Sequence, residues 1–475
     1  MDSTSLLDAV RAWFHRRALL FKIAGVGLLG LLLLIPLAMV RSTLTERHAR
    51  YGEAVGSIAQ TWGGPQRLLG PVLVVPYVWR VEDDEAVVVD GRRVLEKKTK
   101  EMKAEAFFLP ERLEIEGAID PSSRQRGIYT AHVYAARAAI KGHFARPDFS
   151  FVGLRGLEPQ WDRARVELGV SDLRGAREAL VLQWGGARVP LQPGVSLDQV
   201  KTGVHAPVPL TTGEAGVDFA LDLQVNGSGA LSVVPMGRET RVRLVSSWPD
   251  PSFNGAYLPT ERSVTAQGFA ATWHVSFYGR NFPQQWSSVH GEVRPGEADF
   301  AAATFWVELT EGVNAYRVIE RAIKYGVLFL ALVFTTFFLF EAASGLRLNA
   351  LNYLLVGAAL CLFYLGLLAL AEFWPFGAAY GTAAAASLAL VGGYSAAILR
   401  SGRWALGVSG LLGLVYGYLY FVLQMEDYAL LAGTAALFVA LAAVMWVTRR
   451  LDWQGREGES GGTESRSATA PEAGR

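Results

Sequence analysis

Hydrophobic residues gather in six stretches of roughly twenty residues each, one near the N-terminus and five close together in the last third of the chain. A helix rises ~1.5 Å per residue, so a stretch of this length crosses the ~30 Å hydrocarbon core of a bilayer. The N-terminal span is expected at 18–40. The C-terminal spans are expected at 322–342, 351–371, 378–399, 404–424 and 428–448. The pattern predicts a membrane protein with six transmembrane helices and one large insert, residues 41–320.

The apolar spacing changes from continuous to periodic after the first span. Between residues 44 and 62, apolar side chains recur three, four or seven positions apart, with charged residues between them. This spacing predicts that the membrane helix continues as an amphipathic helix over 44–62. Gly63, Gly64 and Pro65 then end it, because glycine is a poor helix former and proline disfavours helix in the preceding residue. The proline-bounded run PVLVVPYVW at 71–79 is the first expected strand.

The rest of the insert has the pattern of β-structure. Residues 217–225 alternate strictly between apolar and other side chains, and Asn226-Gly227 follows, which predicts a half-buried strand leading into a hairpin turn. Similar short runs occupy 113–119, 128–140, 165–170, 179–184, 241–248, 268–278 and 300–309. Glycine and proline separate these runs at frequent intervals, which is typical of an antiparallel sandwich. The expected fold is a helical membrane protein with a large β-rich domain.

Basic residues beside the spans indicate the orientation of the chain in the membrane. Before the first span stand Arg11, His15, Arg16 and Arg17, with Lys22 close enough to the helix end to extend toward the headgroups. The loops that alternate to the same side contain Arg347, Arg400, Arg403, Arg449 and Arg450. The opposite short loops contain Glu372, Glu426 and Asp427 and no lysine or arginine. Under the positive-inside rule, both termini are cytoplasmic and the insert is periplasmic.

The two ends of the chain have separate expectations. Residues 1–17 form the cytoplasmic N-terminus, and the span 18–40 is expected to be an uncleaved signal anchor. Its apolar run is longer than that of a typical signal peptide, and no small-residue cleavage site ends it. The tail 449–475 is rich in glycine, serine, threonine and glutamate, so we expect a disordered cytoplasmic segment.

Charge and cysteine content exclude several classes of protein. The net charge of +1 gives no electrostatic reason to expect a nucleic-acid partner. The single cysteine, Cys361, lies in an apolar stretch, so no intrachain disulfide forms. The partner expected from composition is the lipid bilayer.

Several segments resemble one known family. The stretch 53–77, EAVGSIAQTWGGPQRLLGPVLVVPY, resembles the opening signature of the CreD family of bacterial inner-membrane proteins. Further matches follow in order at 251–285, 324–341, 352–372, 419–431 and 448–453. The resemblance implies an inner-membrane anchor, a periplasmic domain, a C-terminal helical bundle and a role in cell-envelope integrity and stress tolerance. It implies no reaction, ligand or cofactor. Its most compact motif makes candidate functional or structural residues of Trp62, Gly63, Gly64, Pro65 and Gln66.

Known catalytic and metal-binding patterns do not occur in this sequence. The seven histidines show no metal-ligand spacing with cysteine or carboxylates, and the chain contains no G-x-S-x-G, H-E-x-x-H or Walker motif. We therefore expect a noncatalytic protein without a metal or cofactor.

Acidic residues near the membrane are the remaining candidates for chemistry. Glu341 lies at the inner end of the second span, Glu372 at the outer end of the third, and Glu426 with Asp427 between the last two. An ionisable group in a span is costly to bury and is a functional hypothesis by default. Because all four lie at span ends, an interfacial role is the first interpretation. Only Glu341 is deep enough to need a partner, and Arg347 is the nearest basic residue in sequence.

Two functional hypotheses follow. The first is a noncatalytic envelope protein whose periplasmic domain contacts an unidentified envelope component. The alternative is a proton-coupled or lipid-related transporter that uses Glu341, Glu372 or Glu426, although the five C-terminal spans show no obvious inverted repeat. An enzyme acting on lipids or cell-wall precursors is a third reading. The partner and the oligomeric state stay open.

Overall fold

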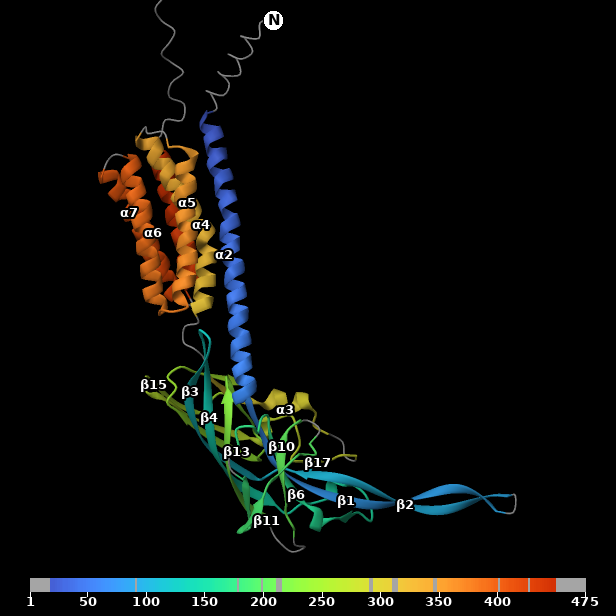
Figure 1. Cartoon of the computed structure of the whole chain (residues 1–475). Coiled ribbons are helices and arrows are strands. Elements are labelled where there is room, and N and C mark those ends of the chain that lie inside the picture. Colours follow the sequence, from blue (N-terminus) through green and yellow to red (C-terminus); the bar gives the residue numbers. More distant parts are fainter. Residues whose placement is uncertain are drawn as a thin grey trace, which may run out of the picture. The chain divides into compact units, whose positions relative to one another are not determined.

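The computed structural model describes residues 18–449 except for the short segments 90–91, 177–178, 198–199, 211–215, 290–293, 310–314, 345–347, 400–401 and 426–427 (Figure 1). The expected cytoplasmic ends, the candidate partner Arg347 and the candidates Glu426 and Asp427 therefore lie outside the described residues, except that Arg449 is described. The chain divides into two compact units. The β unit is Ala49–Gly312, and the helical unit combines Met1–His48 with Val313–Arg475.

One long helix, α2, begins at Ala18 and ends at Trp62. The expected span 18–40 and the expected amphipathic helix 44–62 are thus a single helix of 45 residues. It is counted with the helical unit as far as His48 and with the β unit from Ala49 onward.

The helical unit contains five further helices. They are α4 (Ala315–Ser344), α5 (Ala350–Ala371), α6 (Phe376–Leu399), α7 (Gly402–Gln424) and α8 (Ala429–Thr448). Helices α4 to α7 lie side by side, with α5 against α6, α6 against α7, and α4 against both α5 and α7 (Figure 1). Among the described residues, four helices are long and apolar enough to cross a membrane: α2, α5, α6 and α7. Helices α4 and α8 occupy the two other stretches in which spans are expected.

Aromatic side chains fill the centre of this bundle. The Tyr380 hydroxyl donates to the carbonyl oxygen of Tyr416 at 2.7 Å, and the hydroxyls of Ser387 and Tyr416 are 2.8 Å apart. The ring of Phe363 packs against both tyrosine rings, with centroid distances of 5.4 and 4.6 Å. These hydroxyls have partners inside the protein, as a site without access to water requires.

The β unit contains two sheets. The ten-stranded sheet follows the order β14-β18-β12-β1-β6-β10-β9, with β2, β5 and β17 attached beside it. Its strands are β1 (Gln66–Val89), β2 (Arg92–Phe108), β5 (Glu158–Pro159), β6 (Arg165–Val170), β9 (Gln192–Pro193), β10 (Gly203–Pro207), β12 (Ala230–Val234), β14 (Pro251–Gly255), β17 (Gln285–Ser287) and β18 (Phe305–Leu309).

The eight-stranded sheet follows the order β15-β16-β13-β3-β4-β11-β7-β8. Its strands are β3 (Arg112–Arg126), β4 (Tyr129–Ala145), β7 (Val181–Trp184), β8 (Ala187–Pro190), β11 (Gly216–Ser228), β13 (Glu239–Ser246), β15 (Glu261–Thr265) and β16 (Gly268–Ser276). The described residues of the β unit also include the end of α2, the helix α3 (Glu297–Ala303) and short 3-10 turns at Ser150–Val152, Trp161–Arg163 and Phe277–Gly279.

Apolar side chains from both sheets form one core. The predicted alternation in β11 is confirmed, because Val217, Phe219, Leu221, Leu223 and Val225 are all buried and the residues between 217 and 225 that separate them are not. Most strand pairs are antiparallel. The pairs β1 with β12 and β3 with β13 are parallel, so a purely antiparallel arrangement is wrong.

The predicted hairpin turn at Asn226-Gly227 is wrong. Both residues continue β11, opposite Ala135 and Tyr134 of β4, and the chain turns at Gly229, whose φ is +69°. A Cβ at Gly227 would overlap the ring of Tyr134, so this glycine makes room for an aromatic side chain.

The predicted strand 300–309 is half helix. Residues Glu297–Ala303 form α3, and only Phe305–Leu309 form a strand. The carboxylate of Asp299 accepts a hydrogen bond from the Gly296 amide at 2.8 Å and so caps the helix, which directs Phe300 fully into the core.

The ribbon formed by β1 and β2 was not expected beyond residue 79, because its sequence is highly charged. Their pairing continues from Leu73–Phe108 to Val89–Arg92, and Figure 1 shows the ribbon extending well past the rest of the β unit. In the described part of the ribbon, the ammonium of Lys97 in β2 lies 3.2 Å from the carboxylate of Glu82 in β1. Opposite charges facing each other across a ladder stabilise a pair of strands that a hydrophobic pattern would not reveal.

Candidate functional site

The motif Trp62 to Gln66 forms the junction at which α2 becomes β1. Gly63 has a φ of +148°, and a Cβ there would overlap the carbonyl oxygen of Asn226 in β11. Only glycine combines this backbone conformation with such a close approach. The neighbouring Gly64 has no atom within 4 Å of the position its Cβ would take, and Pro65 is exposed.

Hydrogen bonds join this junction to the β unit. The buried amide of Gln66 donates to the carbonyl oxygens of Asn226 at 2.6 Å and Asp172 at 3.0 Å, and it accepts from the Asp172 amide at 3.2 Å. Ser228 donates from its hydroxyl to the Gly63 carbonyl at 2.9 Å and from its amide to the Gly64 carbonyl at 3.2 Å. The segment after the helix is therefore fixed by five hydrogen bonds to distant parts of the β unit.

The last turns of α2 are held as well. The indole N–H of Trp62 donates to the Tyr134 carbonyl at 3.2 Å, and the Arg124 guanidinium lies 4.2 Å from the centre of its ring. Arg174 donates to the Gln60 carbonyl in the same region. These contacts make the motif a structural connection between helix and sheet.

Asp172 supports this connection from the side. The Arg174 side chain donates to its carboxylate at 2.6 and 3.0 Å, and these hydrogen bonds hold the pKa of Asp172 below its usual value of 3.8. The charged form of Asp172 is thus the form that the fold favours.

The segment with the sequence YGRNFPQ plays a comparable role elsewhere in the β unit. The guanidinium of Arg280 donates to the Met236 carbonyl at 2.8 Å, and the amide of Gln284 donates to the Pro110 carbonyl at 2.8 Å. Burial lowers the pKa of Arg280 to about 10, and the Phe282 ring lies 4.6 Å from its guanidinium. This arginine holds loops of the β unit together.

Glu341 is a buried carboxylate in the helical unit, with 9% of its side chain exposed. Its Oε1 accepts from the Lys22 ammonium of α2 and from the Leu348 amide at 3.0 Å. Its Oε2 accepts from the Tyr353 hydroxyl at 3.0 Å. Lys22 also lies 3.5 Å from the Leu348 carbonyl oxygen. A cation, a hydroxyl and an amide therefore converge on one carboxylate, which lowers the cost of burying its charge.

Glu372 is paired with α2 at the other end of the apolar part of that helix. Its side chain is 9% exposed, and its carboxylate lies 3.6 Å from the guanidinium of Arg47. Because a helix rises ~1.5 Å per residue, Lys22 and Arg47 are roughly 37 Å apart along α2, somewhat more than the ~30 Å hydrocarbon core. Helix α2 is thus ion-paired to the other helices near both ends of its apolar part.

Sequence reasoning selected Glu341 and Glu372 but missed both partners. Lys22 is separated from Glu341 by 319 residues, and proximity in sequence pointed instead to Arg347. One signal was available in the sequence. Lys22 and Arg47 stand at the two ends of the apolar part of α2, and Glu341 and Glu372 stand at opposite ends of the predicted spans. Glu426 and Asp427 are not among the described residues.

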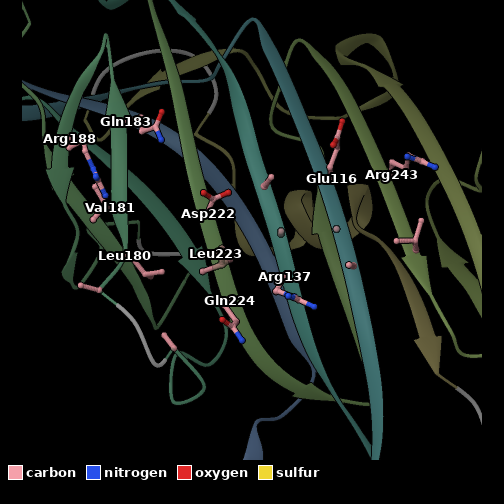
Figure 2. A pocket seen from close by; sticks show the side chains of 17 residues that line it. Glu116, Arg137, Leu180, Val181, Gln183, Arg188, Asp222, Leu223, Gln224 and Arg243 are labelled. Atoms are coloured by element: carbon pink, nitrogen blue, oxygen red, sulfur yellow. The ribbon is translucent and has the colours of Figure 1, made fainter.

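A hollow of about 580 Å³ lies on the exposed face of the eight-stranded sheet, and sequence reasoning did not anticipate it. Figure 2 shows Glu116, Arg137, Asp222, Gln224 and Arg243 around it, with Arg188 and Gln183 on the β7–β8 side. Its floor includes the small residues Gly117, Ala118, Ala138 and Ala139. Neighbouring strands carry charges of alternating sign, so the polar face supports itself by cross-strand pairing.

Metal chemistry finds no support in the part of the chain that the structure describes. There, no group of three or more histidine, cysteine, aspartate or glutamate side chains lies close enough to hold an ion.

Comparison with known proteins places these features in a family. The family described as inner membrane protein CreD matches residues 18–454. The chain is also 33% identical, over 426 residues, to the inner membrane protein CreD of Escherichia coli (strain K12), and the alignment covers 89% of this chain and 91% of that protein. The family match includes the junction after α2, the helix that carries Glu341, and Glu372 at the end of α5. The chain belongs to the CreD family of inner membrane proteins.

Proposed function

We propose that this inner-membrane protein is noncatalytic and maintains the integrity of the cell envelope under stress, with its β unit in contact with an envelope component. The observation that carries the proposal is the junction at Gly63 and Gln66. It connects a large β unit to a membrane helix through a closely packed, hydrogen-bonded segment. Such a connection suits a protein that holds or senses a load better than one that turns over a small molecule.

The proposed arrangement has six membrane spans, with α4 and α8 added to the four candidate spans. Both termini are cytoplasmic and the β unit is periplasmic. The ion pairs support this orientation. The Lys22–Glu341 pair lies at the end of the apolar part of α2 that basic residues precede, and the Arg47–Glu372 pair lies at the other end of that apolar part. Single cysteines introduced by Thr265→Cys or Ser171→Cys, in a Cys361→Ser background, should react in intact cells with a reagent that reaches only the periplasm.

We assign the envelope contact to the hollow in Figure 2, because polar side chains from several strands converge there. The test uses the full chain in cells that lack their own copy. Arg137→Glu combined with Arg243→Glu should reduce survival under envelope stress while the amount of protein in the membrane stays unchanged. Arg262→Glu, on an exposed strand of the same sheet outside the hollow, is the matched control and should leave survival unchanged. Full survival with the double variant would contradict this assignment.

A second candidate function is proton-coupled or lipid-related transport, favoured by the buried carboxylate of Glu341. A proton carrier must release its partners during each cycle, whereas Glu341 is held by Lys22, Tyr353 and Leu348 together. Purified protein in liposomes provides the test. Solute flux that disappears with Glu341→Gln would place transport ahead of the envelope role.

A further inference from the structure

A groove of about 410 Å³ lies between α2 and α4 in the helical unit. Its lining is apolar except for Thr335, whose hydroxyl donates to the Ala331 carbonyl at 2.8 Å and is therefore already satisfied. The groove therefore offers no free hydrogen-bond donor to a polar ligand. Its occupant must be apolar.

The groove exists because α2 packs against its neighbours through one side only. Leu33 is buried against Gly357, and Leu37 is buried against Gly326. On the same face, one and two turns before these leucines, stands Gly30, from which a Cβ would first meet the Phe334 ring at 3.9 Å. Glycines in membrane helices usually let two backbones approach closely. Here they border a gap, which leaves room for something other than protein.

The surroundings identify the occupant, on the premise of the membrane arrangement proposed above. Leu31 lines the groove and is 64% exposed, so the groove reaches the outer surface of the helical unit. Leu28 and Ile35 beside it are 67% and 63% exposed and face the hydrocarbon of the bilayer. A helix from a second copy is ~10 Å across with its side chains, much wider than an acyl chain. An acyl chain is thin enough.

We propose that an acyl chain of a membrane phospholipid occupies the groove between α2 and α4. Lys22 lies one helical turn beyond Val26, which lines the groove, and one third of the Lys22 side chain is exposed. The lipid phosphate lies at this end, where basic residues between helices attract phospholipid headgroups. Bound in this way, the lipid fills the space between the anchor helix and the bundle beside the Lys22–Glu341 pair.

The experiment uses the full chain in nanodiscs of mixed phosphatidylethanolamine and phosphatidylglycerol, with trace lipid that carries a photoactivatable group in its acyl chain. Crosslinked residues are identified by mass spectrometry. In the unmodified protein, labelling should concentrate at groove residues such as Leu34 and Ala331 rather than at the outward-facing Leu28 and Ile35. Competition with either unlabelled lipid then separates an anionic from a zwitterionic headgroup.

Gly30→Leu places a side chain in the groove, and its Cβ makes only an ordinary contact with Phe334. It should lower labelling of the groove about tenfold, the loss expected if two methylene groups are no longer buried there. Gly25→Leu is the matched control, because the same side chain enters open space on the same helix outside the groove. Gly27→Leu, which also meets nothing within 4 Å, replaces Gly30→Leu if that variant does not fold.

Two results would overturn the inference in distinguishable ways. Equal labelling of the groove and of the outward-facing residues, unchanged by Gly30→Leu, would show that lipid covers α2 without preference and would leave the membrane arrangement intact. An absence of labelling both in the groove and at Leu28 and Ile35 would show that this part of α2 is not in the bilayer. The proposed membrane arrangement would then fail together with the lipid inference.

Discussion

Replacing Lys22 by methionine tests whether the buried carboxylate depends on α2. The substitution keeps a long apolar side chain and removes the ammonium that pairs with Glu341. Glu341 keeps the Tyr353 hydroxyl and the Leu348 amide but loses its only described cation. Removing one partner of a buried ion pair costs ~3–5 kcal/mol, because the other charge stays buried without compensation. We expect Lys22→Met to destabilise the helical unit by about this amount.

A double-mutant cycle separates the pair from other effects of the change. Glu341→Gln removes the negative charge and still offers an oxygen to Tyr353 or Leu348, so the double variant should be more stable than Lys22→Met alone by about 2 kcal/mol. The control cycle uses Arg47→Met and Glu372→Gln. That pair is longer, at 3.6 Å, and its arginine is 40% exposed, so its coupling should stay below ~1 kcal/mol.

The measurement is reversible unfolding of the full chain in mixed micelles, titrated with a denaturing detergent and followed by circular dichroism. The reasoning fails if Lys22→Met changes the free energy of unfolding by less than ~0.5 kcal/mol, or if the two cycles give equal coupling. Either result would mean that Glu341 is solvated in some other way.

Three further predictions concern the β unit. In urea unfolding, Gly63→Ala should lower the free energy of unfolding by ~2–4 kcal/mol through backbone strain and overlap with β11, whereas Gly64→Ala should lower it by less than ~1 kcal/mol. Comparable losses for the two variants would contradict the close approach at the junction. Arg165→Met should cost ~3–5 kcal/mol in the same assay, because it leaves the 1% exposed carboxylate of Glu167 without the guanidinium 2.6 Å away, and no loss would show that the charge is compensated elsewhere. Because the pKa of Asp172 is lowered in the folded state, its contribution to the free energy of unfolding is complete above pH ~4 and is lost as the pH falls through the folded-state pKa. Asp172→Asn should therefore reduce the fall in stability with decreasing pH. An unchanged slope below pH ~4 would contradict this role.

The helices could be predicted from sequence because lipid imposes a simple requirement. A span is about twenty apolar residues long and can be recognised without knowing what it packs against, so composition alone locates it. The expected span at 351–371 and the observed helix α5, Ala350–Ala371, differ by one residue. Alternation likewise located β11, because one face of that strand is buried throughout.

The errors occurred where tertiary contacts override a local signal. Asn226-Gly227 has the sequence of a turn, but the glycine is there to accommodate the ring of Tyr134. The charged part of the β1–β2 ribbon lacks a hydrophobic pattern, and the ion pair between Glu82 and Lys97 forms only once the two strands have paired. Such requirements depend on residues far away in the chain.

The candidate site shows the same limit. The cost of burying Glu341 could be recognised from its position, since it follows a long apolar stretch. Its partner Lys22 lies on the N-terminal helix, before the entire β unit, and no spacing rule connects two residues so far apart. The signature around Gly63 was recognisable as a motif, but its role depends on Asn226, Asp172 and Ser228.

The central claim is that α2 connects the β unit to the membrane helices as one continuous helix. The most direct test inserts seven residues between His48 and Ala49, where the two units divide within α2. A helix-forming, alanine-rich insertion adds about two turns and keeps the helix continuous, whereas a glycine- and serine-rich insertion of equal length interrupts it. In cells with equal amounts of each variant in the membrane, the account predicts that the alanine-rich insertion preserves survival under envelope stress and the glycine-rich insertion abolishes it. Equal survival with both insertions would contradict the claim.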